Sequence, residues 1–215
     1  MATKKLFWED PYLKECEATV MKINEREVVL DQSIFYAFSG GQASDSGTIG
    51  EIPVKEAIMS NDDIIYILER EPNFKVGDKV KVKINWDKRF RIMRLHSAAH
   101  VVYFLFKKKT GADKIIGSNV SEEKSRLDYL YEENISSILP EIEKEANELL
   151  SKDIPVKIYF DEKNLGKRLW EPEGMPEWKC PCGGTHVKNL KEIGKLKLKR
   201  KNIGKGKERI EITLA

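Results

Sequence analysis

Three histidines and one cysteine are the side chains of this sequence whose types and spacing could do chemistry. The chain has three His among its 215 residues, and His96 and His100 lie four positions apart. On a helix they share one face, with Cβ atoms roughly 5–6 Å apart, so both imidazoles can reach one ion. His186 ends the glycine-rich motif Cys182-Gly-Gly-Thr-His186. Imidazole and thiolate select zinc over magnesium or calcium, so the pattern predicts a zinc site.

Two common kinds of zinc protein do not fit these motifs. A metalloprotease with the motif His-Glu-x-x-His needs the glutamate as its general base, but Ser97 follows the first histidine here. A zinc finger separates its two ligand pairs by only ~12–15 residues, whereas one pair here lies at 96–100 and the other at 182–186.

The composition is that of a globular protein with a strongly charged surface, 40% hydrophobic and 34% charged residues. No stretch approaches the ~18–20 apolar residues of a membrane span, and the first residues lack the apolar run of a signal peptide. We therefore expect a cytoplasmic protein without a membrane partner. Three cysteines are too few for a disulfide framework, and Cys16 reads as a buried structural thiol.

The residue pattern predicts an α+β protein, beginning with a β-rich domain. The segments 18–23 and 28–30 read as a hairpin, and 79–84 alternates with a period of two. Several short strands separated by turns favour a small β-barrel over residues 1–86. Its loop 38–47 is rich in glycine, which allows positive φ and close approach of a partner to the backbone.

From residue 87 the pattern predicts an α/β domain, 87–215, that contains an antiparallel sheet and the zinc site. Apolar residues at spacings of three and four predict a helix over 92–106, with His96 and His100 near its middle. A second helix near Pro140 and a strand at 155–160 should follow, then an irregular stretch at 170–178. Two strands joined through 202–206 should end the domain.

The last part of the chain is basic. Residues 187–215 contain ten Lys or Arg and three Glu, a net charge of +7, so residues 1–186 carry −4 of the chain's net +3. Such an asymmetry indicates a polyanionic partner such as nucleic acid, although a solvated lysine-rich hairpin would look the same. In the first tail strand the lysines alternate with leucines, so they should project from one face. The proposed phosphate contacts are Lys195, Lys197, Lys199 and Arg200.

Taken together, these motifs resemble the editing domain of alanyl-tRNA synthetase and its free-standing relatives, the AlaX-type trans-editing proteins. His96-Ser-Ala-Ala-His100 is similar to the family's histidine helix. Cys182-Gly-Gly-Thr-His186 is similar to its second ligand pair, and Glu192-Ile-Gly194 follows it at a familiar distance. Phe38-Ser-Gly-Gly-Gln42 resembles the glycine-rich loop of the barrel that precedes the editing domain in the longer AlaX proteins.

The resemblance implies a hydrolase that deacylates mischarged tRNA(Ala), with Ser-tRNA(Ala) as its first and Gly-tRNA(Ala) as its second candidate substrate. Nothing in the chain resembles an ATP-binding core, so it would act in trans without ATP. The resemblance also implies one zinc per chain. Its four ligands, which would also be the catalytic residues, are His96, His100, Cys182 and His186.

Three questions about this metal site stay open at this point. Zinc could polarise the ester carbonyl, activate water or hold the substrate amino group. Four protein ligands would close a tetrahedral site, whereas catalytic zinc keeps a position open, so either coordination expands or one ligand, His186, is loosely held. Cys180 could also replace Cys182, although the spacing to His186 favours Cys182.

Recognition of serine needs a polar group that pairs with its hydroxyl. The candidate substrate-binding residues are Gly40, Gly41 and Gln42 on the glycine loop and Ser118, which follows the first helix. The structural alternatives are a tight turn for the glycine loop and a capping hydroxyl for Ser118. If the loop takes part, it should share a cleft with the zinc site.

Two other functions remain compatible with the sequence. The first is an RNA-binding module with a purely structural zinc, and the second is a zinc amidohydrolase that acts on small molecules. An open or labile metal position would separate the enzyme from the module, and a requirement for tRNA would separate it from the amidohydrolase. The oligomeric state has no signal in the sequence.

Overall fold

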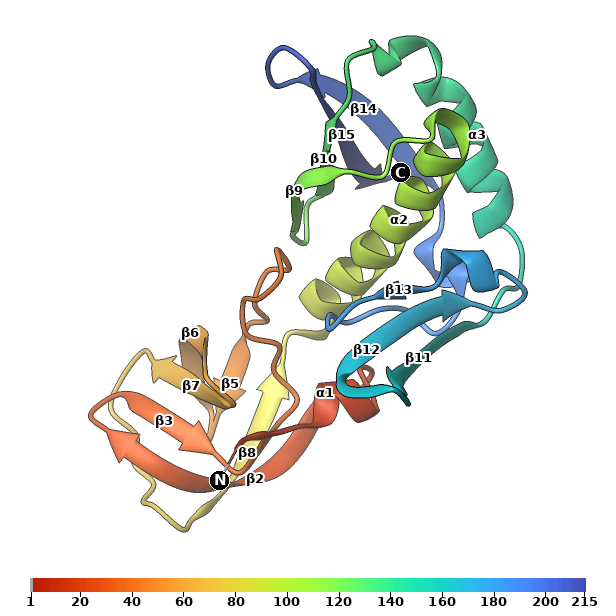
Figure 1. Ribbon diagram of the computed structural model, residues 1–215. Helices are drawn as coiled ribbons and strands as arrows, with labels where there is room; N and C mark the ends of the chain where they lie inside the picture. Colours follow the sequence, from red (N-terminus) through yellow and green to blue (C-terminus); the bar gives the residue numbers. More distant parts are fainter. Residues whose placement is uncertain (1) are drawn as a thin grey trace. The chain divides into compact units, whose positions relative to one another are not determined.

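The computed structural model describes residues 2–215. The chain divides into two compact units, Met1–Phe90 and Arg91–Ala215. The division falls inside the long helix α2 (Trp86–Thr110), close to the predicted domain boundary after residue 86 (Figure 1). Strands dominate both units and helices are few, as expected for the α+β class.

Six strands of the first unit pair in a closed order, β2-β3-β7-β6-β5-β8, and form a small barrel. Every neighbouring pair in this order is antiparallel. The elements of this unit are β1 (Lys4–Lys5), α1 (Leu6–Glu9), β2 (Glu15–Asn24), β3 (Glu27–Leu30), β4 (Gln32–Ser33), β5 (Gly47–Ile49), β6 (Ile52–Ser60), β7 (Asp63–Leu68) and β8 (Lys79–Ile84). The short strands β1 and β4 pair in parallel outside the barrel.

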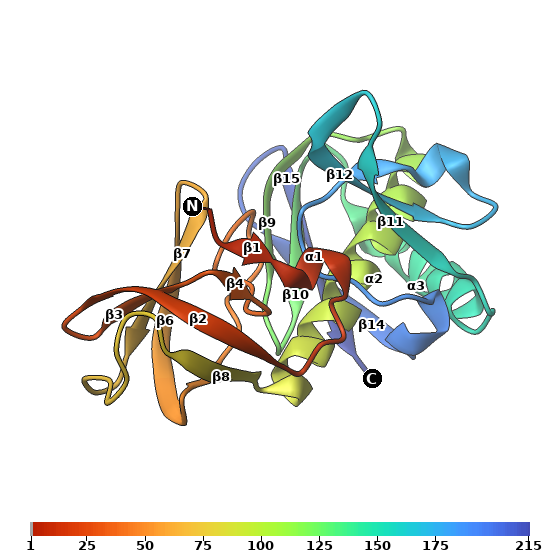
Figure 2. The same ribbon diagram turned by 90° about the horizontal axis from the view of Figure 1, so that it is seen from below.

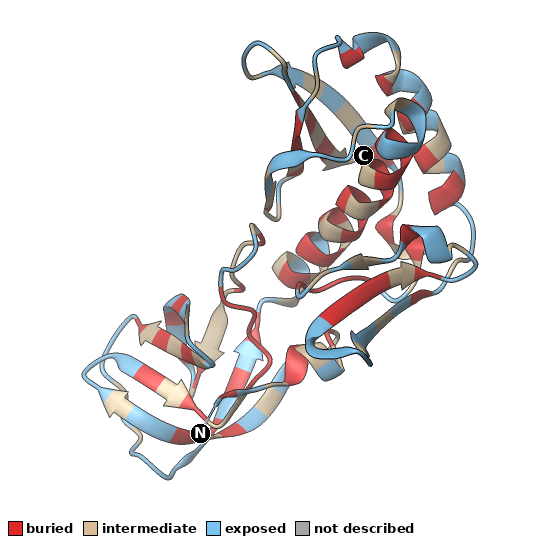
Figure 3. Ribbon diagram, in the orientation of Figure 1, coloured by how far each residue is buried: buried red, intermediate tan, exposed pale blue. Residues whose placement is uncertain are grey.

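Alternation of residue types explains why these segments become barrel strands. Strand β8 is the clearest case, because Val80, Val82 and Ile84 are buried while the lysines between them are exposed (Figure 3). Apolar side chains at alternate positions line one face of a strand and together fill the barrel. Cys16 is half-buried and packs against this core, close to the buried structural thiol expected from the sequence.

The second unit contains a four-stranded antiparallel sheet, β14-β15-β10-β9, and a three-stranded sheet, β11-β12-β13 (Figure 2). Its elements after α2 are β9 (Ile115–Val120), β10 (Ser125–Leu130), η1 (Ile135–Ser137), α3 (Leu139–Leu150), β11 (Val156–Asp161), β12 (Asn164–Pro172), η2 (Pro176–Trp178), β13 (Cys180–Pro181), η3 (Leu190–Ile193), β14 (Leu196–Asn202) and β15 (Lys207–Leu214).

Apolar side chains hold both long helices of this unit in place. The residues that predicted the first helix are all buried along α2; they are Ile92, Leu95, Ala99, Val102 and Phe106. Helix α3 carries Pro140 in its first turn, where the missing N–H costs nothing. It lies against β14, and it buries Ile142, Ala146 and Leu149.

One predicted segment is wrong in part. The residue pattern predicts an irregular chain from Trp170 to Trp178, but β12 extends to Pro172 and the 3-10 helix η2 covers Pro176–Trp178, so only residues 173–175 are irregular. Gly166, Lys167 and Arg168 hide the strand, because they interrupt the apolar alternation by which strands are recognised. In the part of the chain that the structure describes, no helix is long and apolar enough to cross a membrane.

Candidate metal centre

Four side chains converge in the second unit, and they are the four predicted zinc ligands: His96, His100, Cys182 and His186. One ligand atom from each lies within 4.8 Å of all the others. The Sγ atom of Cys182 is 3.3 Å from Nε2 of His96 and 3.4 Å from Nε2 of His186. The Nε2 atoms of His100 and His186 are 3.2 Å apart.

These separations fit a tetrahedral zinc site. Zinc binds imidazole nitrogen at ~2.0–2.1 Å and thiolate sulfur at ~2.3 Å, so the edges of a regular tetrahedron of such ligands are about 3.3–3.6 Å long. Three of the six donor–donor separations, 3.2, 3.3 and 3.4 Å, lie at or just below this length, and the others do not exceed 4.8 Å. Three imidazoles and one thiolate are also a donor set that zinc prefers, so the residues present fit the ion.

Helix α2 and the loop after β13 bring the donors together. The rings of His96 and His100 stack with centroids 5.1 Å apart, as expected for residues one helical turn apart on one face. Ser97 lies between them in the sequence and is fully buried; its Oγ accepts a hydrogen bond from the backbone N–H of Val187 at 3.2 Å. Ser97 therefore fastens the loop directly beyond His186 to the helix.

This role of Ser97 was missed at the level of the sequence, where the residue served only to exclude a protease. Arg94 fastens the same loop further on, since its guanidinium donates to the backbone oxygen of Ile193 at 2.7 and 3.0 Å. A buried serine among the apolar residues of a helix was the only sequence signal for either contact.

Strand β12 holds the other side of the loop. The backbone N–H of Cys182 donates to the oxygen of Arg168 at 2.9 Å. The Arg168 guanidinium is almost fully buried and donates to the backbone oxygen of Gly184 at 3.3 Å. The loop that carries Cys182 and His186 is thus tied to a strand and to a helix at once.

Burial sets the protonation states of the donors. It lowers the pKa of His96 to about 4, and it lowers the pKa of His100 and His186 well below the ordinary value. All three imidazoles are therefore neutral at physiological pH and have a free nitrogen lone pair for a metal. Burial raises the pKa of the Cys182 thiol to about 11, against the opposing effect of the Gly184 backbone and the Arg168 charge. Metal binding must displace this proton.

Cys180 lies outside the cluster, behind His100. Its Sγ is 3.3 Å from Nδ1 of His100, whereas Nε2 of the same ring faces the other donors. The structure thus brings Cys182, and not Cys180, together with the three imidazoles.

From the sequence, His186 was the ligand expected to be loosely held. The residue is fully buried, so its exposure does not indicate a loose ligand. Its Nδ1, however, has no hydrogen-bond partner among the described residues.

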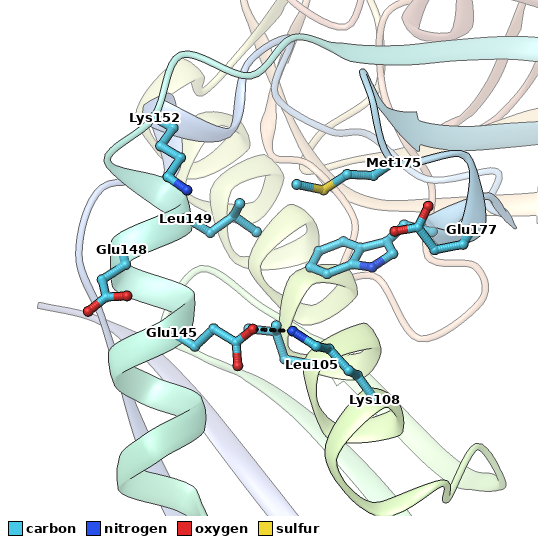
Figure 4. A pocket seen from close by; sticks show the side chains of 9 residues that line it. Leu105, Lys108, Glu145, Glu148, Leu149, Lys152, Met175 and Glu177 are labelled. Carbon is cyan, nitrogen blue, oxygen red and sulfur yellow. Dashed lines mark hydrogen bonds and ion pairs between the residues drawn. The ribbon is translucent and has the colours of Figure 1, made fainter.

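A separate pocket of about 360 Å³ lies between α2, α3 and the turn at Met175–Trp178. Figure 4 shows its walls, with Leu149 and Met175 extending toward its interior and Lys108 paired with Glu145 at 2.7 Å. None of the four clustered donors lines it. The candidate centre is the cluster of ligands and not this pocket.

Two protein-family models match the chain. The model for the "Threonyl and Alanyl tRNA synthetase second additional domain" matches residues 171–211, which include Cys182 and His186. The model for "tRNA synthetases class II (A)" matches residues 6–88, which are almost the whole first unit.

Individual relatives match over nearly the full length. The "Alanyl-tRNA editing protein AlaX-M" of Pyrococcus horikoshii is 38% identical, over 99% of this chain and 98% of its own. The chain belongs to the AlaX-M family. The AlaX-M protein of Methanosarcina barkeri is 36% identical over 99% of both chains. The alanine–tRNA ligase of Methanococcus maripaludis is 37% identical over 97% of this chain but only 26% of its own. The resemblance stated from the motifs is confirmed.

In this AlaX-M member the glycine loop is a tight, anchored hairpin within the first unit. Gly40 and Gly41 have φ of 56° and 83°, and Ser39 and Gln42 pair across them, which is the geometry of a two-residue β-turn that favours glycine. Gln42 is 1% exposed, whereas Phe38, just before the turn, is 61% exposed. The substrate-binding role of Gly40, Gly41 and Gln42 stays a prediction.

A buried ion pair closes the base of this loop. The Arg89 guanidinium donates to Asp45 Oδ1 at 2.8 Å, and Asp45 Oδ2 accepts the backbone N–H of Tyr36 at 2.7 Å. Arg89 also donates to the backbone oxygens of Pro11 and Ile34. Neither charged side chain is more than 1% exposed. No local sequence pattern indicates this pairing, which joins residues far apart in the chain.

The other predicted contacts lie on the four-stranded sheet. Ser118 is exposed in the edge strand β9, opposite Leu127, so it does not cap a helix. In β14 the alternation is as predicted, because Lys197 and Lys199 are exposed while Leu196 is buried. Arg200 lies on the opposite face from these lysines, where its Nε donates to Glu208 at 2.6 Å. Their roles toward a substrate remain predictions.

Proposed function

We propose that this chain is a zinc-dependent hydrolase that deacylates mischarged tRNA(Ala) in trans, with Ser-tRNA(Ala) as the main substrate and Gly-tRNA(Ala) as a second. One observation carries the proposal. A set of three imidazoles and one thiolate, spaced for one tetrahedral zinc, lies in a chain that AlaX-M editing proteins match over 99% of its length. The four residues His96, His100, Cys182 and His186 hold the zinc and form the catalytic centre.

The reaction is hydrolysis of the aminoacyl ester at the 3′ end of the tRNA. The bond between the amino-acid carbonyl carbon and the ribose oxygen breaks, the hydroxyl of water adds to that carbon, and a proton goes to the ribose oxygen. Zinc supplies Lewis acidity for this step. Because ester hydrolysis is downhill in water, no ATP is required.

The physical need for such an enzyme comes from the size of the amino acids. A synthetase pocket for alanine rejects glycine or serine by only roughly 10²-fold, because one methyl or one hydroxyl group changes the binding free energy by a small amount. A second site must remove the errors. We assign recognition of the amino acid to Gly40, Gly41, Gln42 and Ser118.

The tRNA backbone has a suitable surface on the four-stranded sheet. Lys197, Lys199 and Lys201 alternate along the exposed face of the edge strand β14. On the same face, Arg126 and Arg209 of the next strands share Asp128, while Glu211, opposite Lys199, pairs with Lys124. This face therefore carries an excess of positive charge, which binds phosphates. We assign the phosphate contacts to Lys195, Lys197 and Lys199, with Arg200 supporting the hairpin from the other face.

One observation favours a second function, an RNA-binding module with a structural zinc. Three of the separations among the four donors are close to the edge lengths of a closed tetrahedron, and structural zinc sites are closed in this way. A protein with either function would bind zinc and tRNA, but only the enzyme would hydrolyse the aminoacyl ester repeatedly.

The test is deacylation by purified protein of seryl-, glycyl- and alanyl-tRNA(Ala) without ATP, with tRNA binding measured in parallel. We expect multiple turnovers on the seryl and glycyl esters and far slower release of alanine. Binding without any hydrolysis would select the structural-zinc module. Equal hydrolysis of a small seryl ester that lacks the tRNA would select an amidohydrolase-type enzyme instead.

A further inference from the structure

His100 is held on two sides by one pair of residues on neighbouring strands. Trp170 of β12 and Cys180 of β13 are direct cross-strand partners. The indole of Trp170 stacks on the His100 ring, with centroids 4.7 Å apart and planes 20° apart. The Cys180 sulfur lies 3.3 Å from Nδ1, at the edge of the ring that points away from the other three donors.

The proton on His100 follows from this arrangement. Nε2 of His100 lies 3.2 Å from Nε2 of His186, inside the cluster, so Nε2 must carry the lone pair that binds a metal. A neutral imidazole carries its single proton on the other nitrogen. Nδ1 is therefore the donor, and the sulfur of Cys180 is the acceptor.

The two residues restrict different motions of the ring. Stacking on Trp170 resists tilting of the ring plane. The hydrogen bond to Cys180 resists rotation about the Cβ–Cγ bond of His100, which would move Nδ1 and Nε2 out of these positions. Trp170 is itself rigid, because it is fully buried and continues a stack of nearly parallel rings, Phe104 and Trp178. A hydrogen bond to the second nitrogen fixes both tautomer and orientation of a metal-binding histidine.

We propose that Cys180 is a positioning residue, which accepts the Nδ1–H of His100 and so directs Nε2 at the zinc. This inference rests on the proposed zinc site and assigns to Cys180 a role distinct from that of the ligand Cys182. Cys180 is absent from the cluster of four donors, and its sulfur faces the outer nitrogen of His100 instead.

The test compares Cys180→Ala with Cys180→Ser, a pair that differs in one hydroxyl oxygen. Serine keeps an acceptor near Nδ1, and alanine removes it. We expect Cys180→Ala to weaken zinc binding by about 10- to 100-fold, the usual effect of removing such a partner, and Cys180→Ser to recover most of the loss. Zinc affinity is measured by competition with a chelator, and Cys16→Ala is the control for loss of a thiol elsewhere.

Cobalt(II) in place of zinc separates an acceptor from a ligand. Sulfur-to-cobalt charge-transfer absorption reports the number of bound thiolates, so it should be unchanged in Cys180→Ala and absent in Cys182→Ala. Loss of the band in Cys180→Ala would overturn the proposal, as would zinc affinity equal to that of the wild type.

A measurement on the unaltered protein does not depend on any variant folding. In metal-free protein, ¹⁵N NMR of the histidine side chains should show His100 protonated at Nδ1. Protonation at Nε2 would contradict the proposal. Failure of the wild type to bind zinc at all would contradict the proposed function instead, and the NMR result would still decide the role of Cys180.

Discussion

The Sγ atom of Cys182 lies 3.3 Å from Nε2 of His96, although 86 positions separate the two residues. Helix α2 supplies one side of this contact and the loop after β13 supplies the other. Ser97 and Arg168 fasten that loop through hydrogen bonds to its backbone, so the contact does not depend on a metal to draw the donors together. A site prepared in this way needs little ordering of the chain to take up the proposed zinc.

The first prediction concerns the identity of the thiolate ligand. Cys182→Ala should reduce bound zinc from about one per chain to a small fraction, because it removes a ligand from a four-donor set. Elemental analysis of dialysed protein measures this, and Cys16→Ala, at the barrel core of the first unit, should retain its zinc. The assignment is wrong if Cys182→Ala keeps its zinc while Cys180→Ala loses it.

The second prediction is that the metal-free protein becomes less stable in mild acid. The pKa of His96 falls to about 4 in the folded chain because of burial, below its value of ~6.5 in an unfolded chain. The folded state therefore binds fewer protons between these values. The stabilisation is complete above about pH 6.5 and is lost as the pH falls toward 4.

Urea unfolding of metal-free protein at about pH 7.5 and about pH 5 measures this loss. His96→Gln provides the control, since a glutamine takes up no proton and should make the dependence on pH shallower. An equal dependence in the variant and the wild type would place the acid sensitivity at other groups.

The third prediction concerns the buried ion pair at the base of the glycine loop. Asp45→Ala should lower the free energy of unfolding by about 3–5 kcal/mol, because it leaves the Arg89 guanidinium buried without its carboxylate. Glu15→Ala removes the acid of the exposed pair Lys81–Glu15 and should hardly change the free energy of unfolding, because solvent screens an exposed ion pair. Similar losses in the two variants would mean that the Arg89 pair does not anchor the loop.

The fourth prediction concerns the glycine loop in catalysis. Gln42→Ala should impair deacylation of seryl- and glycyl-tRNA(Ala) and leave the zinc content unchanged. Initial rates and metal analysis of the same preparation give both quantities, and circular dichroism checks that the barrel is folded. Unaltered turnover on both substrates would make the loop a purely structural hairpin.

The fifth prediction concerns the basic face of β14. Lys197→Ala combined with Lys199→Ala should weaken tRNA binding and reduce the salt slope of the affinity by about 0.7–0.9 for each phosphate that is no longer neutralised. The ratio of seryl to alanyl hydrolysis should hardly change, since side chains that bind phosphates do not read the amino acid.

Strand β8 offers a matched control for this double variant. Lys79 and Lys81 also alternate along an exposed strand face, but each is paired with a glutamate. Replacing both with alanine should leave the salt slope unchanged. An unchanged slope in the β14 variant as well would place the tRNA on another surface.

The parts of this protein that the sequence predicts are those with local, periodic or motif signals. Helix α2 follows from apolar spacing, and the His-x-x-x-His and Cys-x-x-x-His motifs predict the cluster because ligand chemistry limits the possible arrangements. The lysines of β14 follow from alternation with leucine. Each of these signals is contained in one short segment of the sequence.

The remaining features depend on pairings between distant residues. Strand β12 was partly missed, since its polar residues interrupt the apolar pattern and its strand structure comes from pairing with β11 and β13. Neither the bond from Val187 to Ser97 nor the ion pair of Arg89 with Asp45 has a local pattern. The contact of Cys180 with His100 likewise becomes visible only when the two sheet strands and the helix are assembled.

The most direct test of the central claim is the zinc dependence of deacylation on one preparation of the protein. Release of serine from Ser-tRNA(Ala) is measured for the zinc-loaded protein, after removal of the metal by a chelator, and after zinc is restored. We predict rapid release, loss of activity, and recovery in proportion to bound zinc up to about one ion per chain. Full activity of protein that elemental analysis shows to be metal-free would contradict the account.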